Sequence, residues 1–214
     1  MKGFNTEQEL VNLFKTAYSR KFDAENTRVL EEVGVGFGIA DLVITELKDS
    51  LYFEAREKLN SVDISVYQTV KSKKEISLED IRGITGIGKS ELKKSLTKLI
   101  EYSYLKEIDS LFLLDKKYEL PFKKSIAFEA KLSNWKRAFM QAYRYKWFAN
   151  YSYVLLDETR ARPAIKRVSH FENHNVGLLT LSIDGEIKIY HRPKRQAPMN
   201  PSMQMMLSEN LLYQ

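Results

Sequence analysis

Hydrophobic and polar positions fall into three stretches, in which strand-like patterns give way to helical spacing and then return. The first stretch opens with a predicted helix over residues 6–18. Thr6 is a suitable N-cap for it, and an apolar stripe follows at helical spacing: Leu10, Leu13, Phe14 and Ala17. Residues 29–47 predict paired strands, with three glycines that allow a tight bend or bulge: Gly34, Gly36 and Gly38. Residues 51–53 predict a short third strand.

The middle stretch has the spacing of helices. Its longest helix carries an apolar stripe with a helical period: Leu92, Leu96, Leu99 and Ile100. The pattern predicts helices over 64–73, 78–84 and 90–102, followed by short strands over 104–108 and 111–114. Three helices closed by a small hairpin resemble a winged helix-turn-helix.

In the last stretch the alternating pattern resumes. The dipeptide Asp184-Gly185 is a strong two-residue turn signal and predicts a hairpin. The expected elements are a strand over 125–131, a helix over 134–148, a strand over 151–156, a helix over 163–171 and hairpin strands over 177–182 and 186–190. The tail beyond Pro198 carries no pattern that assigns an element.

The composition allows a substantial hydrophobic core. The chain has 214 residues, of which 43% are hydrophobic, enough for one large domain or two small ones. It contains no cysteine, which excludes disulfides, a zinc-finger cage and thiol catalysis. Residues 1–7 lack the apolar core of a secretory signal, and no apolar run approaches the roughly 20 residues of a membrane helix. We therefore expect a soluble, cytoplasmic protein with no membrane partner.

The net charge of +6 is unevenly distributed along the chain. Residues 1–60 carry 8 basic and 11 acidic side chains, and residues 61–120 carry 11 and 10. Residues 121–214 carry 15 basic and 7 acidic side chains, which is a net charge of +8. A basic C-terminal third could attract a polyanion such as nucleic acid. The charge alone is weak evidence for nucleic-acid binding, because many basic proteins never touch nucleic acid.

Carboxylates interrupt two apolar runs that lie far apart in the chain. Asp41 is the single charge in residues 38–44, and Glu129 and Lys131 lie in residues 126–132. Residues two apart in a strand share a face, so Glu129 and Lys131 should project to the same side. An acid and an amine at an apolar strand's end are costly unless something uses them. This combination indicates a nuclease.

The order of these motifs resembles that of the PD-(D/E)xK nuclease superfamily, which has the restriction-endonuclease-like fold. Gln141 and Tyr145, four apart on a predicted helix, are similar to the QxxxY motif of one branch of that superfamily. The resemblance covers roughly residues 1–56 and 121–192. It implies an α/β protein with a mixed sheet flanked by helices. The nuclease-like core would then comprise residues 1–60 and 121–214, with a small winged-helix domain inserted at residues 61–120.

The resemblance also implies a role for each motif residue. Asp41 and Glu129 would hold Mg²⁺ or Mn²⁺ with the carbonyl of Ala130 as a third ligand, since hard cations prefer oxygen and keep several waters. Phosphodiester hydrolysis needs such a cation to offset charge on the phosphate and to lower the pKa of a bound water. Lys131 would orient or activate that water. Gln141 would position the substrate or Lys131, and Tyr145 would contact the backbone phosphate.

A glutamate from the first helix often completes such sites. Glu7 suits this role better than Glu9, because it extends the face of Leu10 and Phe14. Structural interpretations stay open for every candidate. Glu7 could favour the helix dipole, and Asp41 could bond to a turn. The remaining candidates could form a surface pair, Glu129 with Lys131, or flank the packing stripe of the helix, Gln141 and Tyr145.

Two other segments imitate functional motifs. Residues 53–56 repeat the pattern of residues 128–131, but they have Arg56 where the superfamily has lysine, and no helix with Gln-x-x-x-Tyr spacing follows. Residues 83–90 match the Walker A pattern. A P-loop follows a buried parallel strand, whereas the segment before residue 83 is charged and helical in period. We therefore expect no ATP binding there.

The same segment suits a helix-turn-helix better, because Gly86 and Gly88 allow a tight turn. The helix that follows has a polar face opposite its apolar stripe: Lys89, Ser90, Lys93, Lys94 and Thr97. This face could enter a major groove or bind phosphates, although winged helices also serve as protein–protein modules. His170 and His174 have i,i+4 spacing but no nearby carboxylate partner, and we expect them to be surface histidines.

The sequence thus predicts a Mg²⁺-dependent DNA endonuclease whose winged helix aids DNA binding. DNA is the expected partner, and a homodimer is left open. The main alternative is a non-catalytic DNA-binding regulator on the same scaffold, and a protein-interaction adaptor is the third.

Overall fold

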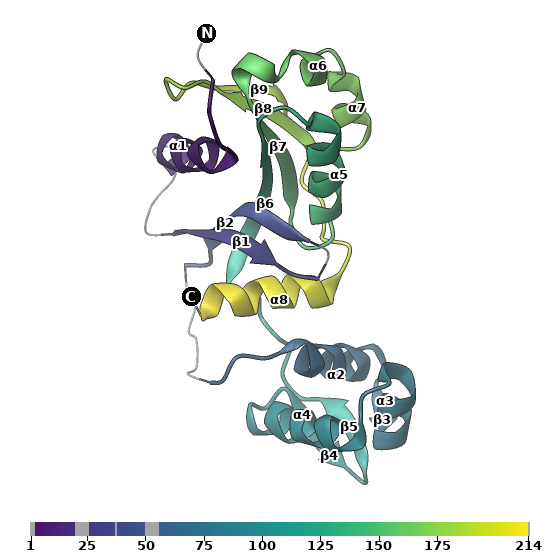
Figure 1. Cartoon of the computed structure of the whole chain (residues 1–214). Helices are drawn as coiled ribbons and strands as arrows, with labels where there is room; N and C mark the ends of the chain where they lie inside the picture. The colour runs from purple at the N-terminus through teal and green to yellow at the C-terminus, as the bar shows by residue number, and fades with distance from the viewer. Residues whose placement is uncertain (1–2, 20–25, 37, 50–55, 214) are drawn as a thin grey trace. The chain divides into compact units, whose positions relative to one another are not determined.

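The computed structural model of the chain describes residues 3–19, 26–36, 38–49 and 56–213. The chain divides into two units, whose elements are labelled in Figure 1. The first unit takes in Met1–Leu51 and Phe122–Asn200, and the second takes in Tyr52–Pro121 and Pro201–Gln214. The C-terminal tail, grouped from the sequence with the predicted nuclease-like core, thus falls in the second unit. The strand predicted over residues 51–53 lies outside the described part of the chain.

A six-stranded mixed sheet forms the centre of the first unit. Its strands follow the order β1-β2-β6-β7-β8-β9: Thr27–Gly34 (β1), Ile39–Leu47 (β2), Phe122–Lys131 (β6), Tyr151–Asp157 (β7), Gly177–Leu181 (β8) and Ile187–His191 (β9). The three strands β6, β7 and β8 are parallel, and all other pairs are antiparallel. Helices flank the sheet, so the predicted α/β class with a mixed sheet is confirmed.

Helix α1 (Glu7–Ser19) covers one face of this sheet (Figure 1). Thr6 caps it as predicted, because its hydroxyl accepts a hydrogen bond of 3.1 Å from the amide of Glu9. Phe14 is fully buried, and its ring lies 5.0 Å from that of Phe128 on β6. Side chains alternate along a strand, so Glu129 projects from the opposite face of the sheet.

Helix α5 (Trp135–Tyr145) packs on that opposite face through Ala138 and Ala142, which are fully buried. Three short helices follow β7: Glu158–Arg160 (η1), Arg162–Ile165 (α6) and Val168–Asn173 (α7). The single helix predicted over residues 163–171 is therefore wrong. The chain leaves helical geometry at Arg167, where φ is −119° and ψ is 26°.

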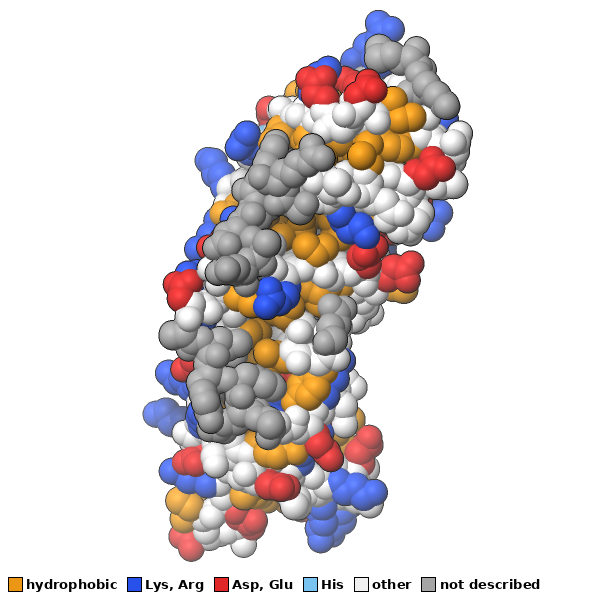
Figure 2. Space-filling model, turned by 90° about the vertical axis from the view of Figure 1, so that its left-hand side faces the viewer, with side chains coloured by type: hydrophobic (Ala, Val, Ile, Leu, Met, Phe, Trp, Pro, Cys, Tyr) orange, Lys and Arg blue, Asp and Glu red, His pale blue; other side chains and the backbone are white. Residues whose placement is uncertain are grey.

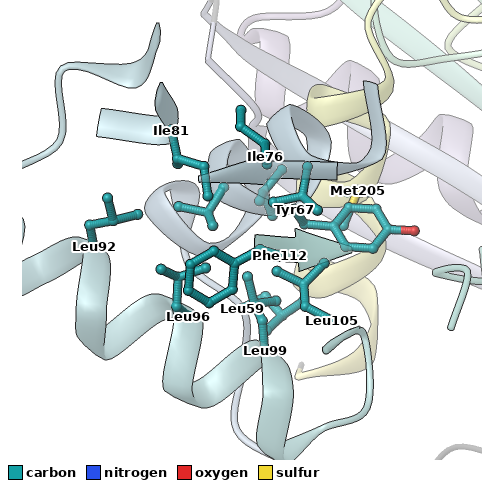
Figure 3. Packing of buried hydrophobic residues seen from close by; sticks show 13 residues of the cluster. Leu59, Tyr67, Ile76, Ile81, Leu92, Leu96, Leu99, Leu105, Phe112 and Met205 are labelled. Atoms are coloured by element: carbon teal, nitrogen blue, oxygen red, sulfur yellow. The ribbon is translucent and has the colours of Figure 1, made fainter. Parts of the chain in front are cut away.

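The second unit combines four helices with a small sheet in the part of it that the structure describes. Its elements are Ser61–Ser72 (α2), Glu75–Ser77 (β3), Leu78–Thr85 (α3), Lys89–Glu101 (α4), Leu105–Ile108 (β4), Leu111–Leu114 (β5) and Pro201–Leu212 (α8). The sheet has the strand order β3-β5-β4. Figure 3 shows its hydrophobic core, in which Met205 of α8 packs with residues of α2, α3 and α4.

Local sequence signals explain where these helices begin and end. Asn60 and Asp63 form a capping box at the start of α2, and Ser77 caps α3. Gly86 ends α3 in a left-handed conformation, with φ of 69°, which glycine adopts without strain. Residues 83–90, which match the Walker A pattern, therefore join two helices.

A buried ion pair ties α8 into the second unit. The two terminal nitrogens of the Arg56 guanidinium donate to the carboxylate of Glu209, at 2.5 and 3.0 Å, and the two side chains are 5% and 1% exposed. The same carboxylate accepts hydrogen bonds from the Leu59 amide (2.7 Å) and the Tyr118 hydroxyl (2.7 Å). Arg56 belongs to residues 53–56, which repeat the sequence pattern of residues 128–131. It is thus held within the second unit. Residues 53–55 lie outside the described part of the chain.

Charged side chains are mixed on the surface that Figure 2 shows. Lysine and arginine alternate there with aspartate and glutamate, and hydrophobic side chains lie between them. Basic side chains therefore form no single patch on the part of this face that Figure 2 shows uncovered. None of the helices in the described ranges is both long and apolar enough to cross a membrane.

Candidate active site

Strands β2 and β6 bring Asp41 and Glu129 together. The two strands are antiparallel neighbours, and Leu42 pairs with Phe128. Asp41 precedes Leu42 and Glu129 follows Phe128, so the two acids lie next to each other across the strands. Both acids project from the sheet face that α5 covers, because Leu42 and Phe128 pack toward α1. Glu129 is fully buried, whereas the Asp41 side chain is 32% exposed.

The ammonium of Lys131 lies among three carboxylates. Its Nζ is 3.0 Å from Oε1 of Glu129, 2.9 Å from Oε2 of Glu7 and 3.9 Å from Oδ2 of Asp41. The three acids come from three elements, β6, α1 and β2, and the Lys131 side chain is only 14% exposed. Glu7 thus lies at the cluster, whereas the Glu9 carboxylate accepts a hydrogen bond from the Asn5 amide (2.9 Å).

Hydrogen bonds hold both strand carboxylates in place. The Tyr145 hydroxyl lies at hydrogen-bond distance from Oε2 of Glu129 and also 2.9 Å from the Ile39 carbonyl, so it links α5 to both strands. The Ala130 amide donates to Oδ2 of Asp41 at 2.7 Å, and the Ala130 carbonyl accepts from Nζ of Lys131 at 2.9 Å. In this arrangement Tyr145 contacts Glu129. Its predicted contact with a phosphate stays a prediction.

A groove of about 290 Å³ lies beside Tyr145 on α5, and Gln141 is part of its lining. The Gln141 side-chain oxygen is buried and has no hydrogen-bond partner among the described residues. Two residues of the lining were missed from the sequence, Arg137 and Arg144. Helical periodicity could have found them, because they lie four residues before and three after Gln141 and so share its face. Both arginines are exposed and carry no ion pair within the described ranges.

The electrostatics of the cluster favour a cation. Burial raises the pKa of Glu129, and the neighbouring Asp41 charge adds to this, while Tyr145 and Lys131 act in the opposite direction. Burial also raises the pKa of Asp41, although the Ala130 amide opposes it. Burial lowers the pKa of Lys131, but Glu7, Glu129 and Asp41 outweigh it and the pKa is raised overall. One ammonium thus faces three acids, which leaves excess negative charge.

The donor set fits a hard divalent ion that keeps much of its water. Oε1 of Glu129 is buried and accepts no hydrogen bond of good geometry from any described residue, although it pairs with the Lys131 charge. The carboxylate of Asp41 and the carbonyl of Ala130 lie beside it. No group of three or more His, Cys, Asp or Glu side chains in the described part of the chain could by itself hold a metal. Water would have to complete the coordination, as Mg²⁺ usually requires.

The raised pKa of Glu129 predicts how stability depends on pH. A carboxyl whose pKa is raised by folding binds its proton more tightly in the folded state. It therefore favours folding most below its ordinary pKa of about 4.3, and this contribution is lost as pH rises through the raised pKa. We expect Mg²⁺ to restore stability at the higher pH, because the cation would offset the negative charges of ionised Asp41 and Glu129.

The measurement is the melting temperature between pH 5 and pH 8, in EDTA and in Mg²⁺. The difference between the wild type and Glu129→Gln isolates this residue, because the other titrating groups are common to both. The Mg²⁺-induced rise should grow with pH in the wild type and be small in the variant. An equal rise in both proteins would contradict the role assigned to Glu129.

The residues predicted to bind DNA lie on α4 of the second unit. All of them are exposed: Lys89, Ser90, Lys93, Lys94 and Thr97. Lys89 lies 3.9 Å from Glu79, and that glutamate also contacts Arg82. The helix therefore presents a lysine-containing solvated face, and its binding role stays a prediction.

Neither a family model, nor a curated protein, nor a solved structure matched the chain when it was compared with them.

Proposed function

We propose that this protein is a Mg²⁺- or Mn²⁺-dependent DNA endonuclease that hydrolyses phosphodiester bonds. The observation that carries the proposal is the Lys131 ammonium, which lies 3.9 Å or less from carboxylates of β6, α1 and β2. Burying such charges costs stability unless they are used, and clusters of perturbed groups concentrate at functional sites. The motif order in the sequence, which resembles the PD-(D/E)xK superfamily, supports the same conclusion.

The residues divide the chemistry between them. Asp41, Glu129 and the Ala130 carbonyl would hold the cation, with Glu7 near it. When bound, the cation would supply charge to offset the phosphate and would lower the pKa of a coordinated water. Tyr145 and the Ala130 amide keep the two carboxylates oriented. Such preorganised charges cost no rearrangement during the reaction.

Lys131 would act as a charged group. The surrounding acids raise its pKa and so favour its charged form in the absence of a cation. It would orient the attacking water and offset the charge that develops on the phosphate. Gln141, Arg137 and Arg144 would hold the substrate backbone in the adjoining groove, since guanidinium groups bind phosphate oxygens in a fork geometry.

The second unit would serve as a winged helix-turn-helix that engages DNA. In its favour are the helix pair α3 and α4, joined by the Gly86 turn, and the hairpin of β4 and β5 that follows. The exposed lysines of α4 would then contact phosphates.

A non-catalytic DNA-binding regulator is the second candidate function. It is favoured by the completeness of the ion-pair cluster, because Lys131 already balances part of the acidic charge. This protein would bind DNA without cutting it.

Cleavage of plasmid and linear DNA separates the candidates. We expect nicking or cutting in Mg²⁺ or Mn²⁺, none in EDTA, and loss of activity in Asp41→Ala and Lys131→Ala. Lys124→Ala is the matched control, because Lys124 lies on the same strand β6 and pairs with Glu46 at 3.4 Å near the other end. Its activity should equal that of the wild type.

Each other outcome has a distinct meaning. Cutting that persists in both site variants would contradict the assigned residues. Salt-sensitive DNA binding without cutting would support the regulator. No binding to DNA at low salt would support the protein-interaction adaptor instead.

A further inference from the structure

A second groove, of about 650 Å³, lies between α5 and α7 in the first unit. Its lining includes Trp135, Lys136 and Phe139 from α5, and Arg167 and His170 from α7 and the residue before it. None of these side chains contributes to the candidate active site. The volume of the groove falls within the range of small-molecule sites.

One wall of the groove is aromatic and firmly supported. The rings of Phe139 and His170 lie 4.3 Å apart, and those of Trp135 and His170 lie 6.3 Å apart. Phe171 is fully buried behind them, 5.2 Å from Phe139. His170 itself is exposed, and Trp135 is half-buried. Flat rings stack well on such a wall, because aromatic rings attract at separations of about 4.5–7 Å.

The rim of the groove is basic. Lys136 and Arg167 are both exposed and have no ion-pair partner among the described residues. No carboxylate is among the residues that line the groove. An occupant with a flat ring and a negative charge beside it therefore matches both features.

The groove also adjoins the one beside the candidate active site. Met140, which is 54% exposed, lines both grooves, and Arg137 and Gln141 line the other. A polyanionic strand held at Arg137 could therefore continue along α5 to Lys136.

We propose that this groove binds one unpaired nucleotide of a nucleic-acid strand. The planes of Trp135 and His170 are 74° apart, so the base would stack on the face of one ring and contact the edge of the other. The phosphate would lie at Lys136 and Arg167. A base inside a duplex is stacked between its neighbours, so only a single-stranded or flipped-out nucleotide can enter. The inference rests on the proposed function for the role of the strand as substrate, which would then be single-stranded or locally opened DNA.

The two tryptophans of the chain allow a direct binding assay. Replacing the exposed Trp147 by phenylalanine leaves Trp135 as the only reporter. We expect its fluorescence to be quenched saturably by oligothymidylate, measured in EDTA so that no cleavage occurs. Duplex DNA should quench it much less, and inorganic polyphosphate, which has charge but no bases, should not quench it.

Variants at the rim and wall test the assignment in the same background. His170→Ala, and the pair Lys136→Gln with Arg167→Gln, should each weaken oligothymidylate binding by about tenfold, the scale of one lost base stack or two lost phosphate contacts. Lys166→Gln is the matched control, since Lys166 is exposed and precedes Arg167 without lining the groove. It should bind as tightly as the parent.

The outcomes separate this inference from the proposed function. Quenching with no cleavage in Mg²⁺ would leave the nucleotide site standing and overturn the endonuclease. Cleavage in Mg²⁺ without any quenching would overturn the nucleotide site and leave the endonuclease standing. Equal quenching by polyphosphate, or unchanged affinity in both groove variants, would overturn the nucleotide site.

Discussion

Glu129→Gln should abolish divalent-ion-dependent cleavage, with a loss of about 10³-fold or more in rate, the scale of removing one preorganised electrostatic group. Glutamine keeps the size of the side chain and an oxygen that can accept the Tyr145 hydrogen bond. It removes the negative charge that pairs with Lys131 and that would hold the cation. The rate of plasmid nicking in Mg²⁺ measures the effect.

The same substitution should leave the protein folded and at least as stable at pH 8 in EDTA. Glu129 is fully buried and its raised pKa shows that its ionised form is disfavoured there. Loss of activity with no loss of stability would mark a group kept for function. Glu46→Gln is the matched control, because Glu46 lies on β2, is 43% exposed and pairs with Lys124. Retained cutting in Glu129→Gln would contradict the site.

Arg56→Met should destabilise the second unit by about 3–5 kcal/mol, the cost of removing one partner from a buried ion pair. The Glu209 carboxylate, 1% exposed, would be left with the Leu59 amide and the Tyr118 hydroxyl as its hydrogen-bond partners among the described residues. We expect faster amide hydrogen exchange in α2 and α8 and a lower urea midpoint for this unit. Met205 on α8 belongs to the core, so loosening the helix would expose it.

Lys106→Gln provides the control for that experiment. Lys106 pairs with Asp115 at 3.4 Å in the same unit, but both side chains are more than 40% exposed. Such surface pairs contribute about 0–1 kcal/mol. Equal destabilisation by the two substitutions would show that the Arg56–Glu209 pair contributes no more to stability than a surface ion pair.

Strands with a long buried apolar run could be predicted from the sequence. The central residues of β2, β6 and β7 are buried in succession, so each strand contains an apolar run, and a charge within that run is conspicuous. This is why Asp41 and Glu129 could be named before their positions were known. Strand alternation also placed Lys131 on the same side as Glu129.

Other elements left no local signal. The buried residues of α8 include Ser208 and Glu209 beside Met203, Met205 and Leu207, so they form no apolar stripe of helical period. β3 has three residues, and its pairing with β5 depends on a partner more than thirty residues away along the chain. The break between α6 and α7 is a matter of backbone geometry at Arg167. Tertiary packing, not local pattern, determines these features.

The groove arginines were missed for a different reason. Arg137 and Arg144 share a helix face with Gln141. Charges on a helix surface are usually solvated, so by themselves they do not indicate a binding site. Their significance comes from the neighbouring carboxylate cluster, which only the fold assembles. The choice of Glu7 over Glu9, by contrast, followed from the helix face of Leu10 and Phe14, and Glu7 is the glutamate that lies at Lys131.

Anomalous diffraction from crystals grown with Mn²⁺ would locate the cation directly. We expect a manganese peak in contact with the carboxylate oxygens of both Asp41 and Glu129, and we expect this peak to be lost in Glu129→Gln. A map with no peak there, at a Mn²⁺ concentration that supports cleavage, would contradict this expectation, as would a peak held by other residues alone.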